Sequence, residues 1–263
     1  MGVLNITPDS FSDGGLFLDP ARAVDHAELM VADGADIIDI GGESTRPGSE
    51  PVALEDELSR VIPVISALTK HLSVPISVDT CKSAVARRAI DAGASMVNDI
   101  FGLRSDPEMA RVVASTGVPV CVMHIRGTPK IMQKNPSYEA LIPEIMDSLR
   151  QSIGIALDAG IAEENIIVDP GIGFGKTFNH NLEILNRLKE FSALGKPLLI
   201  GVSRKAFIGK ILDDAPVQDR LAGTLAAVAV AVCNGAQIVR VHDVKVTSQA
   251  VRVVDAILRE ACC

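Results

Sequence analysis

The stretch ADGADIIDI at residues 32–40 combines the end of a helix, a glycine and a short run of mostly apolar residues. DAGASMVNDI at 91–100 and NGAQIVRV at 234–241 repeat this arrangement. In each copy a glycine closes a helix, and a strand without polar–apolar alternation follows shortly after it. Such strands are typical of parallel sheets that helices cover on both faces. The repeat therefore predicts an α/β protein built from strand–helix units.

Similar β-rich runs occur along the whole chain. They begin at Val3, Asp36, Val74, Ser95, Pro119, Ile166, Pro197 and Ile238. The residues between them leave room for a crossover helix each time, and eight such units over about 250 residues predict a closed (β/α)8 TIM barrel. A doubly wound open sheet is the alternative, because periodicity alone does not separate the two. The first strand, Gly2–Asn5, is short, and the absence of a linker predicts one domain over residues 1–263.

Composition excludes several classes of protein. The 263 residues are 48% apolar, carry a net charge of -8, and include one Tyr and no Trp. A nucleic-acid surface would need a basic stripe and stacking aromatic residues. The longest apolar run, residues 225–233, is too short to span a membrane, and no secretory signal is visible, so we expect a cytoplasmic protein. Five cysteines without a C-x-x-C pair argue against a disulfide scaffold and a zinc site.

Polar residues end nearly every predicted strand, where an apolar core would not select them. They are Asn5, Asp39, Asp79, Asn98 with Asp99, His124, Asp169, Ser203, and Arg240 with His242. The carboxyl ends of barrel strands and the loops that follow them form the active-site face. A role as a helix N-cap or turn residue is the alternative for single residues such as Asp99, Asp106 and Asp13. A shared site explains the whole set better than capping does.

The two halves of this ring differ in chemistry. One half offers acceptors and an amide that suit a flat heterocycle with several N–H donors, namely Asp79, Asn98 and Asp169. The other half forms a cationic patch from Lys205, Arg240, His242, Asn5 and Arg46. We interpret this patch as a site for phosphate or diphosphate. Ordinary ion pairing of Lys205 and Arg240 with the acids is the alternative.

Three loops accompany the ring. Residues 7–15 (TPDSFSDGG) and 41–48 (GGESTRPG) are small and polar, as are mobile lids that close over a substrate, although plain solvent-exposed loops also look like this. Residues 170–177 (PGIGFGKT) resemble a Walker A loop, but Pro170 stands where its first glycine is required. In that loop Phe174 is a candidate to stack on a planar ligand, with a place in the core as the alternative.

Several motifs, taken together and in this order, resemble the dihydropteroate synthase family. They are NITPDSFSDGG at 5–15, GGESTRPG at 41–48, VDT at 78–80, NDI at 98–100, VDPGIGFGK at 168–176, GVSRK at 201–205 and RVHD at 240–243. The resemblance covers essentially the whole chain. It implies the condensation of 6-hydroxymethyl-7,8-dihydropterin diphosphate with p-aminobenzoate, which gives 7,8-dihydropteroate and pyrophosphate.

The resemblance also implies roles for individual residues. The pterin would be held by Asp79, Asn98, Asp169 and Lys205. The diphosphate would be held by Arg240 and His242, and by Asn5 through magnesium, with Thr45 near the same ligand and Val241 as a further substrate-binding residue. The p-aminobenzoate side would be shaped by Ser203, Arg46 and Phe174. The chemistry would depend on Asp79, Asp169, Lys205, Arg240 and His242.

Other functions remain as alternatives at this point. A pterin-dependent methyltransferase serving a corrinoid protein would share the barrel and the pterin contacts, but it has no use for a diphosphate site. A phosphosugar aldolase would use Lys205 as a Schiff base, although no apolar strand surrounds this residue. A non-catalytic pterin-binding or scaffold protein is the third. The resemblance further implies a homodimer, and the apolar stretch 221–233 either faces a second subunit or packs between helices.

Overall fold

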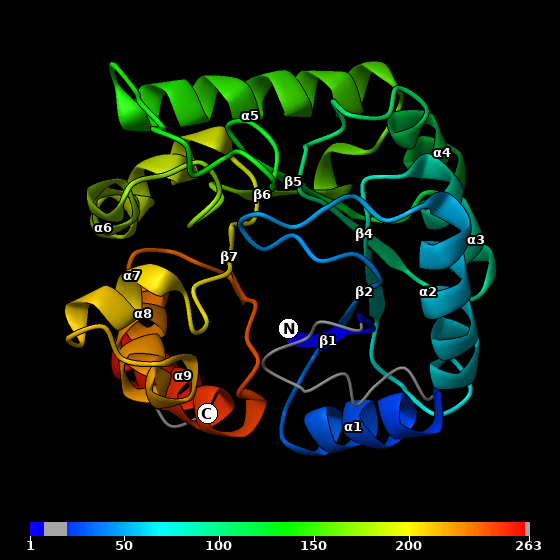
Figure 1. The fold of residues 1–263 in the computed structure, drawn as a ribbon, viewed down its shortest axis with the longest axis horizontal. Coiled ribbons are helices and arrows are strands. Elements are labelled where there is room, and N and C mark those ends of the chain that lie inside the picture. The colour runs from blue at the N-terminus through cyan, green and yellow to red at the C-terminus, as the bar shows by residue number, and fades with distance from the viewer. Residues whose placement is uncertain (8–19, 261–263) are drawn as a thin grey trace.

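The computed structural model describes residues 1–7 and 20–260 of the chain. Eight strands form an inner ring within these residues, and the helices lie outside it (Figure 1). The strands are β1 (Gly2–Asn5), β2 (Ile38–Gly41), β3 (Ile76–Asp79), β4 (Met96–Asp99), β5 (Val120–Met123), β6 (Ile166–Asp169), β7 (Leu199–Ile200) and β8 (Ile238–Val239). The predicted order of strands and the parallel α/β class are confirmed.

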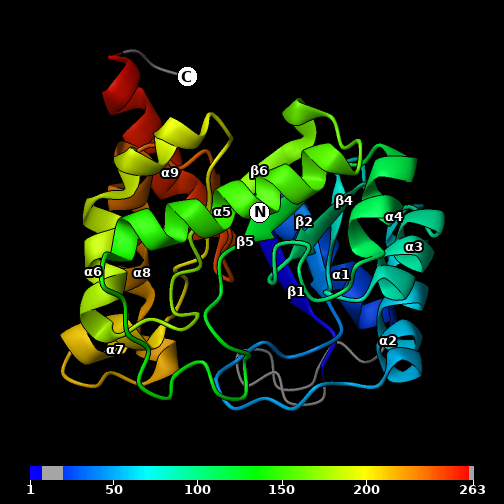
Figure 2. The same cartoon turned by 90° about the horizontal axis from the view of Figure 1, so that it is seen from above.

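The helices follow the strands as the spacing predicts. They are α1 (Pro20–Ala32), α2 (Leu54–Leu68), α3 (Ser83–Asp91), α4 (Met109–Thr116), α5 (Leu141–Asp158), α6 (Phe178–Asn186), α7 (Ala206–Ile211), α8 (Leu221–Cys233) and α9 (Val244–Arg259). Figure 2 shows α6, α8 and α9 on one side of the strands, and α2, α3 and α4 on the opposite side. In the described part of the chain, no helix is long and apolar enough to cross a membrane.

Closure of the sheet distinguishes a barrel from the open alternative. Strands β1 to β6 pair in sequence order, all parallel, and β7 pairs with β8. Backbone bonds close the two remaining seams. Val168 N–H donates to the Pro197 carbonyl at 2.9 Å, and Val3 N–H donates to the Val241 carbonyl at 3.0 Å. The short strand β1 therefore pairs on both edges, and the TIM-barrel prediction is confirmed.

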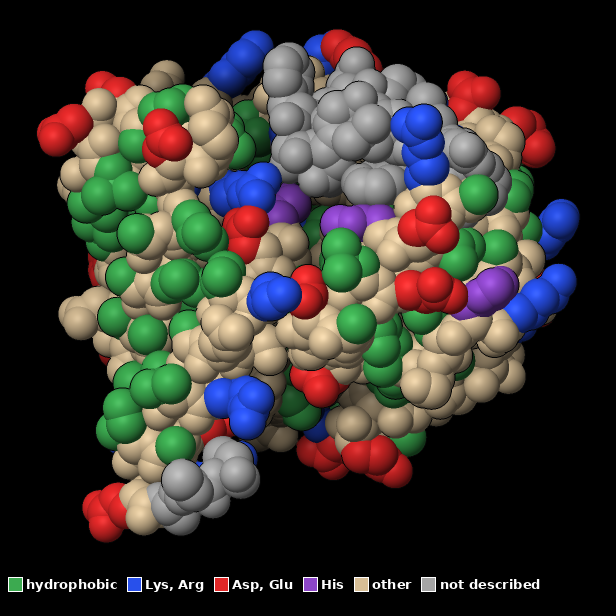
Figure 3. Space-filling model, turned by 90° about the horizontal axis from the view of Figure 1, so that it is seen from below, with side chains coloured by type: hydrophobic (Ala, Val, Ile, Leu, Met, Phe, Trp, Pro, Cys, Tyr) green, Lys and Arg blue, Asp and Glu red, His purple; other side chains and the backbone are tan. Residues whose placement is uncertain are grey.

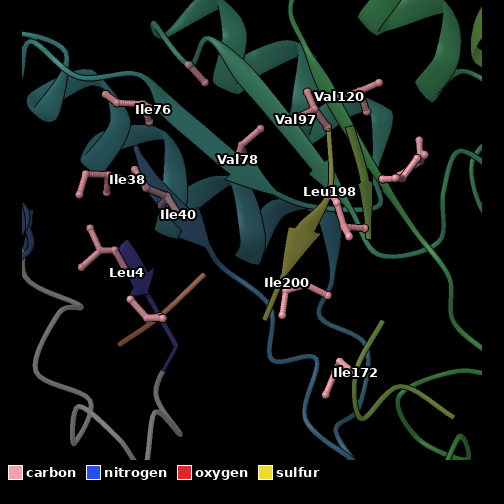
Figure 4. Close-up of a cluster of buried hydrophobic side chains, with 14 of the residues drawn as sticks. Leu4, Ile38, Ile40, Ile76, Val78, Val97, Val120, Ile172, Leu198 and Ile200 are labelled. Atoms are coloured by element: carbon pink, nitrogen blue, oxygen red, sulfur yellow. The ribbon is translucent and has the colours of Figure 1, made fainter. Parts of the chain in front are cut away.

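Alternation along each strand separates two environments. Leu4, Ile40, Val78 and Val97 point outward from the ring and belong to the large core that packs against the helices (Figure 4). A second apolar cluster forms from residues on the opposite, inward face, namely Met1, Met96, Cys121, Ile167 and Leu199. These side chains fill the lower part of the barrel. Residues two positions further along each strand therefore face inward again, one layer closer to the carboxyl ends.

Candidate active site

The upper inward layer of the barrel is polar. Asn98 lies two residues after Met96, Asp169 two residues after Ile167, and all four are buried. Asp39 and Asp79 occupy the corresponding positions on β2 and β3 and are also buried. The alternation that directs apolar side chains into the lower layer directs these carboxylates and this amide into the mouth above it. Four members of the predicted ring of polar strand ends, Asp39, Asp79, Asn98 and Asp169, thus face inward together.

Arg240 lies at the centre of this layer. Its Nε donates to Asp39 Oδ2 at 2.6 Å, and its Nη2 donates to Asp79 Oδ2 at 2.8 Å. Asn98 Nδ2 donates to the same Asp39 oxygen at 3.3 Å. The other oxygen, Asp39 Oδ1, is buried without a hydrogen-bond partner among the described residues. Asp39 is fully enclosed by the protein, so its role here is to hold Arg240 and Asn98.

This network corrects the expected separation of charges. The sequence predicted acids in one half of the ring and cations in the other, with pairing between them as the alternative. The structure shows Arg240 paired with two carboxylates. The reason is geometric. Arg240 directly follows β8, which lies next to β1 in the closed ring, and the Arg240 side chain extends across to β2 and β3. Arg240 therefore reaches both the acids and the larger pocket of the site.

Burial controls protonation of the two predicted pterin-binding acids. Burial raises the pKa of Asp79 to about 7, although the adjacent Arg240 opposes the rise. Burial likewise raises the pKa of Asp169 to about 6, while the Gly171 N–H, 2.7 Å from Asp169 Oδ1, opposes it. Both groups thus titrate close to neutral pH, the range in which functional carboxylates are commonly found.

A pocket of about 770 Å³ opens beside Arg240. It is lined by predicted site residues from the end of β1 and from the loops after β2, β6, β7 and β8, namely Asn5, Thr45, Arg46, Phe174, Ser203, Lys205, Arg240 and His242. Lys205 Nζ lies 4.2 Å from the centre of the Phe174 ring. Burial lowers the pKa of Lys205 to about 8, so that its ammonium form still predominates at neutral pH. Phe174 lines this pocket, as the stacking prediction requires.

His242 differs from its predicted charge. Its Nδ1 lies 2.9 Å from Ser203 Oγ, and its backbone N–H donates to the same oxygen at 3.2 Å. Burial lowers the pKa of His242 to about 3, and the nearby Arg240 and Arg204 add to this effect. His242 is therefore a neutral imidazole at pH 7 and serves as a hydrogen-bonding group, not as part of a cationic patch.

Other predicted residues lie around these groups. Val241 is buried in the core, and its backbone N–H and carbonyl bond to Met1 and Val3 as the barrel closes.

The loop at 41–48 contacts the loop after β5, because Gly48 N–H donates to the Pro129 carbonyl at 2.9 Å. The predicted lid at 7–15 lies outside the described residues apart from Thr7, which lines the large pocket.

The alternative of a cap or turn residue is confirmed for two acids. Asp99 accepts the backbone N–H groups of Phe101 and Leu103 at 2.9 and 2.8 Å. Asp106 accepts the N–H of Ser83 at 2.8 Å. Asp13 lies outside the described residues.

A smaller pocket of about 230 Å³ shares Thr45 with the large one and is lined by Asp79. Its wall holds an ion-pair cluster in which Lys82 bonds Glu43 and the buried Glu57. Thr80 Oγ1 donates to Glu57 at 2.6 Å. Because these polar groups are partnered within the protein, we interpret the cluster as support for the loop that carries Asp79.

Two residues of the site were missed from the sequence. Asp39 was recognised as a polar strand end but received no role, although an acid inside the apolar run DIIDI is itself a signal. Lys176 was considered only as part of a failed Walker A motif, yet it is 2% exposed and lines the large pocket. No local pattern marks its partner His124, which lies 52 residues away at the end of β5.

Comparison with known proteins agrees with this geometry. The family described as pterin binding enzyme matches residues 1–242. The dihydropteroate synthase of Bacillus subtilis (strain 168) is 51% identical over 260 residues, which cover 99% of this chain and 88% of that protein. The chain belongs to the dihydropteroate synthase family. Its members are transferases, and the chain is an enzyme of this type.

Solved structures support the same assignment. A crystal structure of the Yersinia pestis dihydropteroate synthase with a sulfonamide drug has a TM-score of 0.95 and 45% identity, covering 99% of this chain and 93% of that one. The Xanthomonas albilineans dihydropteroate synthase with 4-aminobenzoic acid has a TM-score of 0.91 and 43% identity, covering 98% and 92%. These relatives favour the synthase over the corrinoid-dependent methyltransferase alternative.

Proposed function

We propose that this site condenses 6-hydroxymethyl-7,8-dihydropterin diphosphate with p-aminobenzoate, which gives 7,8-dihydropteroate and pyrophosphate in folate biosynthesis. The observation that carries the proposal is the layer of buried carboxylates, Asp79 and Asp169, beside the cations Arg240 and Lys205. A dihydropterin presents N–H donors along one edge and a diphosphate at the other end. The polar layer offers acceptors for the N–H edge of the pterin, and the adjacent large pocket offers a cation and hydrogen-bonding groups for the diphosphate.

The ring of the pterin would be held by acceptors of the polar layer. Asp79, Asp169 and the Asn98 amide supply oxygens. Binding of a donor-rich ring favours the ionised carboxylates, because each N–H bonds to the charged form. The ammonium of Lys205 and the Phe174 ring would flank the ring where it meets the p-aminobenzoate side.

The diphosphate would be held in the large pocket. Arg240 supplies a guanidinium fork, and the neutral His242 and Ser203 supply further hydrogen bonds. Asn5 also lines this pocket and offers a carboxamide oxygen. Magnesium commonly binds one or two protein oxygens together with substrate phosphates, so this donor fits a magnesium ion that arrives with the diphosphate. When bound, the ion would neutralise charge on the leaving group.

The chemical step is a displacement at the exocyclic methylene. The bond between this carbon and the diphosphate oxygen breaks, the amine nitrogen of p-aminobenzoate bonds to the carbon, and the nitrogen then loses a proton. The electron-rich ring supports positive charge on the methylene as diphosphate departs. Asp79 and Asp169 would stabilise this charge, while Arg240 would stabilise the diphosphate. No nucleophilic side chain takes part.

Pyrophosphate release tests the function directly. The purified protein, with magnesium and both substrates, is expected to release pyrophosphate and form 7,8-dihydropteroate in equal amounts. Omitting either substrate is the control. Transfer of a methyl group from a methylated pterin to a corrinoid protein, without pyrophosphate release, would favour the alternative instead.

The pH dependence of kcat/KM provides a test of Lys205. We expect a bell-shaped profile with an acidic limb near the pKa values of Asp169 and Asp79, about 6 and about 7, and a basic limb near that of Lys205, about 8. Lys205→Arg should move the basic limb to higher pH, because arginine stays protonated. The exposed Lys70→Arg is the matched control, and a basic limb unmoved in Lys205→Arg would contradict the assignment.

We propose that the enzyme is a homodimer through α8 and its neighbours. Ala222, Ala226, Val230 and Cys233 are exposed at helical spacing on α8, and Val253 and Ile257 are exposed on the adjacent α9. Figure 3 shows many hydrophobic side chains on the left of the molecule, the side of α7, α8 and α9 in Figure 1. A contiguous apolar surface favours association. Sedimentation velocity at micromolar concentration tests this, and a lone monomer would refute it.

We also propose that the protein works in the cytoplasm. Cys81, Cys121 and Cys233 are free thiols among the described residues, as in proteins of reducing compartments. Fractionation of cells that produce the full chain is the test.

A further inference from the structure

Lys176 is a buried lysine whose ammonium bonds no carboxylate in the described part of the chain. Its Nζ lies 2.7 Å from His124 Nδ1 and donates to the carbonyls of His124 and Phe174 at 3.2 and 3.1 Å. Burial lowers the pKa of Lys176, and burial beside Lys176 lowers the pKa of His124 to about 2. Burying an amine is costly, so a simple space-filling role would favour an apolar side chain.

The three acceptors fasten the loop at 170–177 to the end of β5. One carbonyl belongs to the loop, and the other carbonyl and the imidazole belong to His124. The loop approaches β5 so closely that a Cβ on Gly171, whose φ is 72°, would lie 2.0 Å from the His124 carbonyl oxygen. Lys176 therefore bonds across a seam where the two backbones nearly touch.

Other bonds hold the remaining peptide groups of the loop. Gly173 N–H donates to Asn181 Oδ1 at 2.7 Å, and Tyr138 Oη donates to the Gly175 carbonyl at 2.8 Å. The Phe174 carbonyl lies between these two anchors and accepts from Lys176. The Phe174 carbonyl is thus held by Lys176, between neighbouring peptide groups that other residues hold.

The loop in turn shapes the site at two points. The Phe174 ring packs against Lys205 Nζ at 4.2 Å, and a Cβ on Gly173 would lie 3.3 Å from Lys205 Cδ. At the start of the loop, Gly171 N–H donates to Asp169. A shift of the loop would move Phe174 and the Lys205 stem together, on the side of the pocket assigned to p-aminobenzoate.

We propose that Lys176 is a positioning residue of the synthase, which fixes Phe174 against Lys205 and so forms the p-aminobenzoate side of the pocket. It acts through the Phe174 backbone, and its ammonium is turned inward toward β5. The inference rests on the synthase function of the chain. Wild-type pyrophosphate release is therefore measured first, since its absence would count against that function and not against the role of Lys176.

The test is a double-mutant cycle of Lys176→Met with Phe174→Ala. In Lys176→Met we expect the KM for p-aminobenzoate to rise about tenfold, which lies within the coupling energies found between residues in contact. The change in kcat should be smaller. The KM for the pterin diphosphate should change less than about twofold. In the Phe174→Ala background, Lys176→Met should change the KM for p-aminobenzoate by less than about twofold. Lys189→Met, an exposed lysine, is the matched control.

Two results would overturn the proposal. Equal increases in both KM values would indicate general loosening of the barrel, and an undiminished effect in the Phe174→Ala background would show that Lys176 acts by another route. If Lys176→Met does not fold, Lys176→Gln replaces it, because the amide keeps N–H donors on a shorter stem. A rise confined to the KM for p-aminobenzoate supports the role in this variant, and unchanged KM values overturn it.

Discussion

Arg240→Met is expected to destabilise the protein by about 3–5 kcal/mol at pH 8, because it leaves buried carboxylates without their cation. Arg240 bonds Asp39 and Asp79 at 2.6 and 2.8 Å, and both acids are buried. Arg240 opposes the rise of the Asp79 pKa, so its removal should raise this pKa further. Urea unfolding of the wild type and variant measures the difference in the free energy of unfolding.

The sign of the pH dependence follows from linkage. The pKa of Asp79 is higher in the folded state than its ordinary value of 3.8, so the folded protein binds more protons at this group. The contribution of Asp79 to stability therefore falls as the pH rises from about 3.8 to about 7. The loss caused by Arg240→Met should therefore shrink at pH 5. The exposed Arg22→Met is the control, with an expected change within about 0.5 kcal/mol. An equal loss at pH 5 and pH 8 would contradict this explanation.

The same variant separates the two ends of the substrate. Arg240→Met should weaken binding of the pterin diphosphate more than binding of the free pterin alcohol, because only the former carries the anion that Arg240 would hold. Calorimetry at matched pH measures both affinities. Equal losses for the two ligands would place the diphosphate elsewhere.

Asp169→Asn is expected to lower kcat by about 100- to 1000-fold, the range seen when one electrostatic contact to a transition state is removed. The amide oxygen can still accept the Gly171 N–H, so the loop should keep its conformation. The variant loses the negative charge that would face the cationic methylene. Steady-state pyrophosphate release measures the effect.

Asp99→Asn is the matched control for this charge. Asp99 is also buried at a strand end, and burial raises its pKa to about 6, but it accepts backbone N–H groups of its own turn. Its replacement should reduce stability and leave kcat close to that of the wild type. Unchanged turnover in Asp169→Asn would refute the proposed role of this acid.

The sequence was sufficient to predict the strand–helix units of the barrel because their signals are local, whereas the closure of the ring was decided by contacts between β1 and the segment after β8 and between β6 and β7. Gly34 and Gly93, with φ of 102° and 113°, end their helices as the repeat predicts, and the apolar stripe of α2 buries Val61, Ile65 and Leu68. Polar strand ends identified Asp79, Asn98 and Asp169 for the same reason, since the inward-facing position recurs at every second residue. Periodicity along one chain segment carries all of this information.

Charge states and partners depended on contacts between distant segments. Arg240 bonds Asp39, which lies 201 residues away, and Lys176 bonds His124, which lies 52 residues away. Burial makes His242 neutral and brings Asp79 and Asp169 close to neutral pKa values. By itself the sequence determined which side chains reach the mouth of the barrel. Only the tertiary structure decided which of them pair and which stay charged, because desolvation and pairing depend on the whole closed ring.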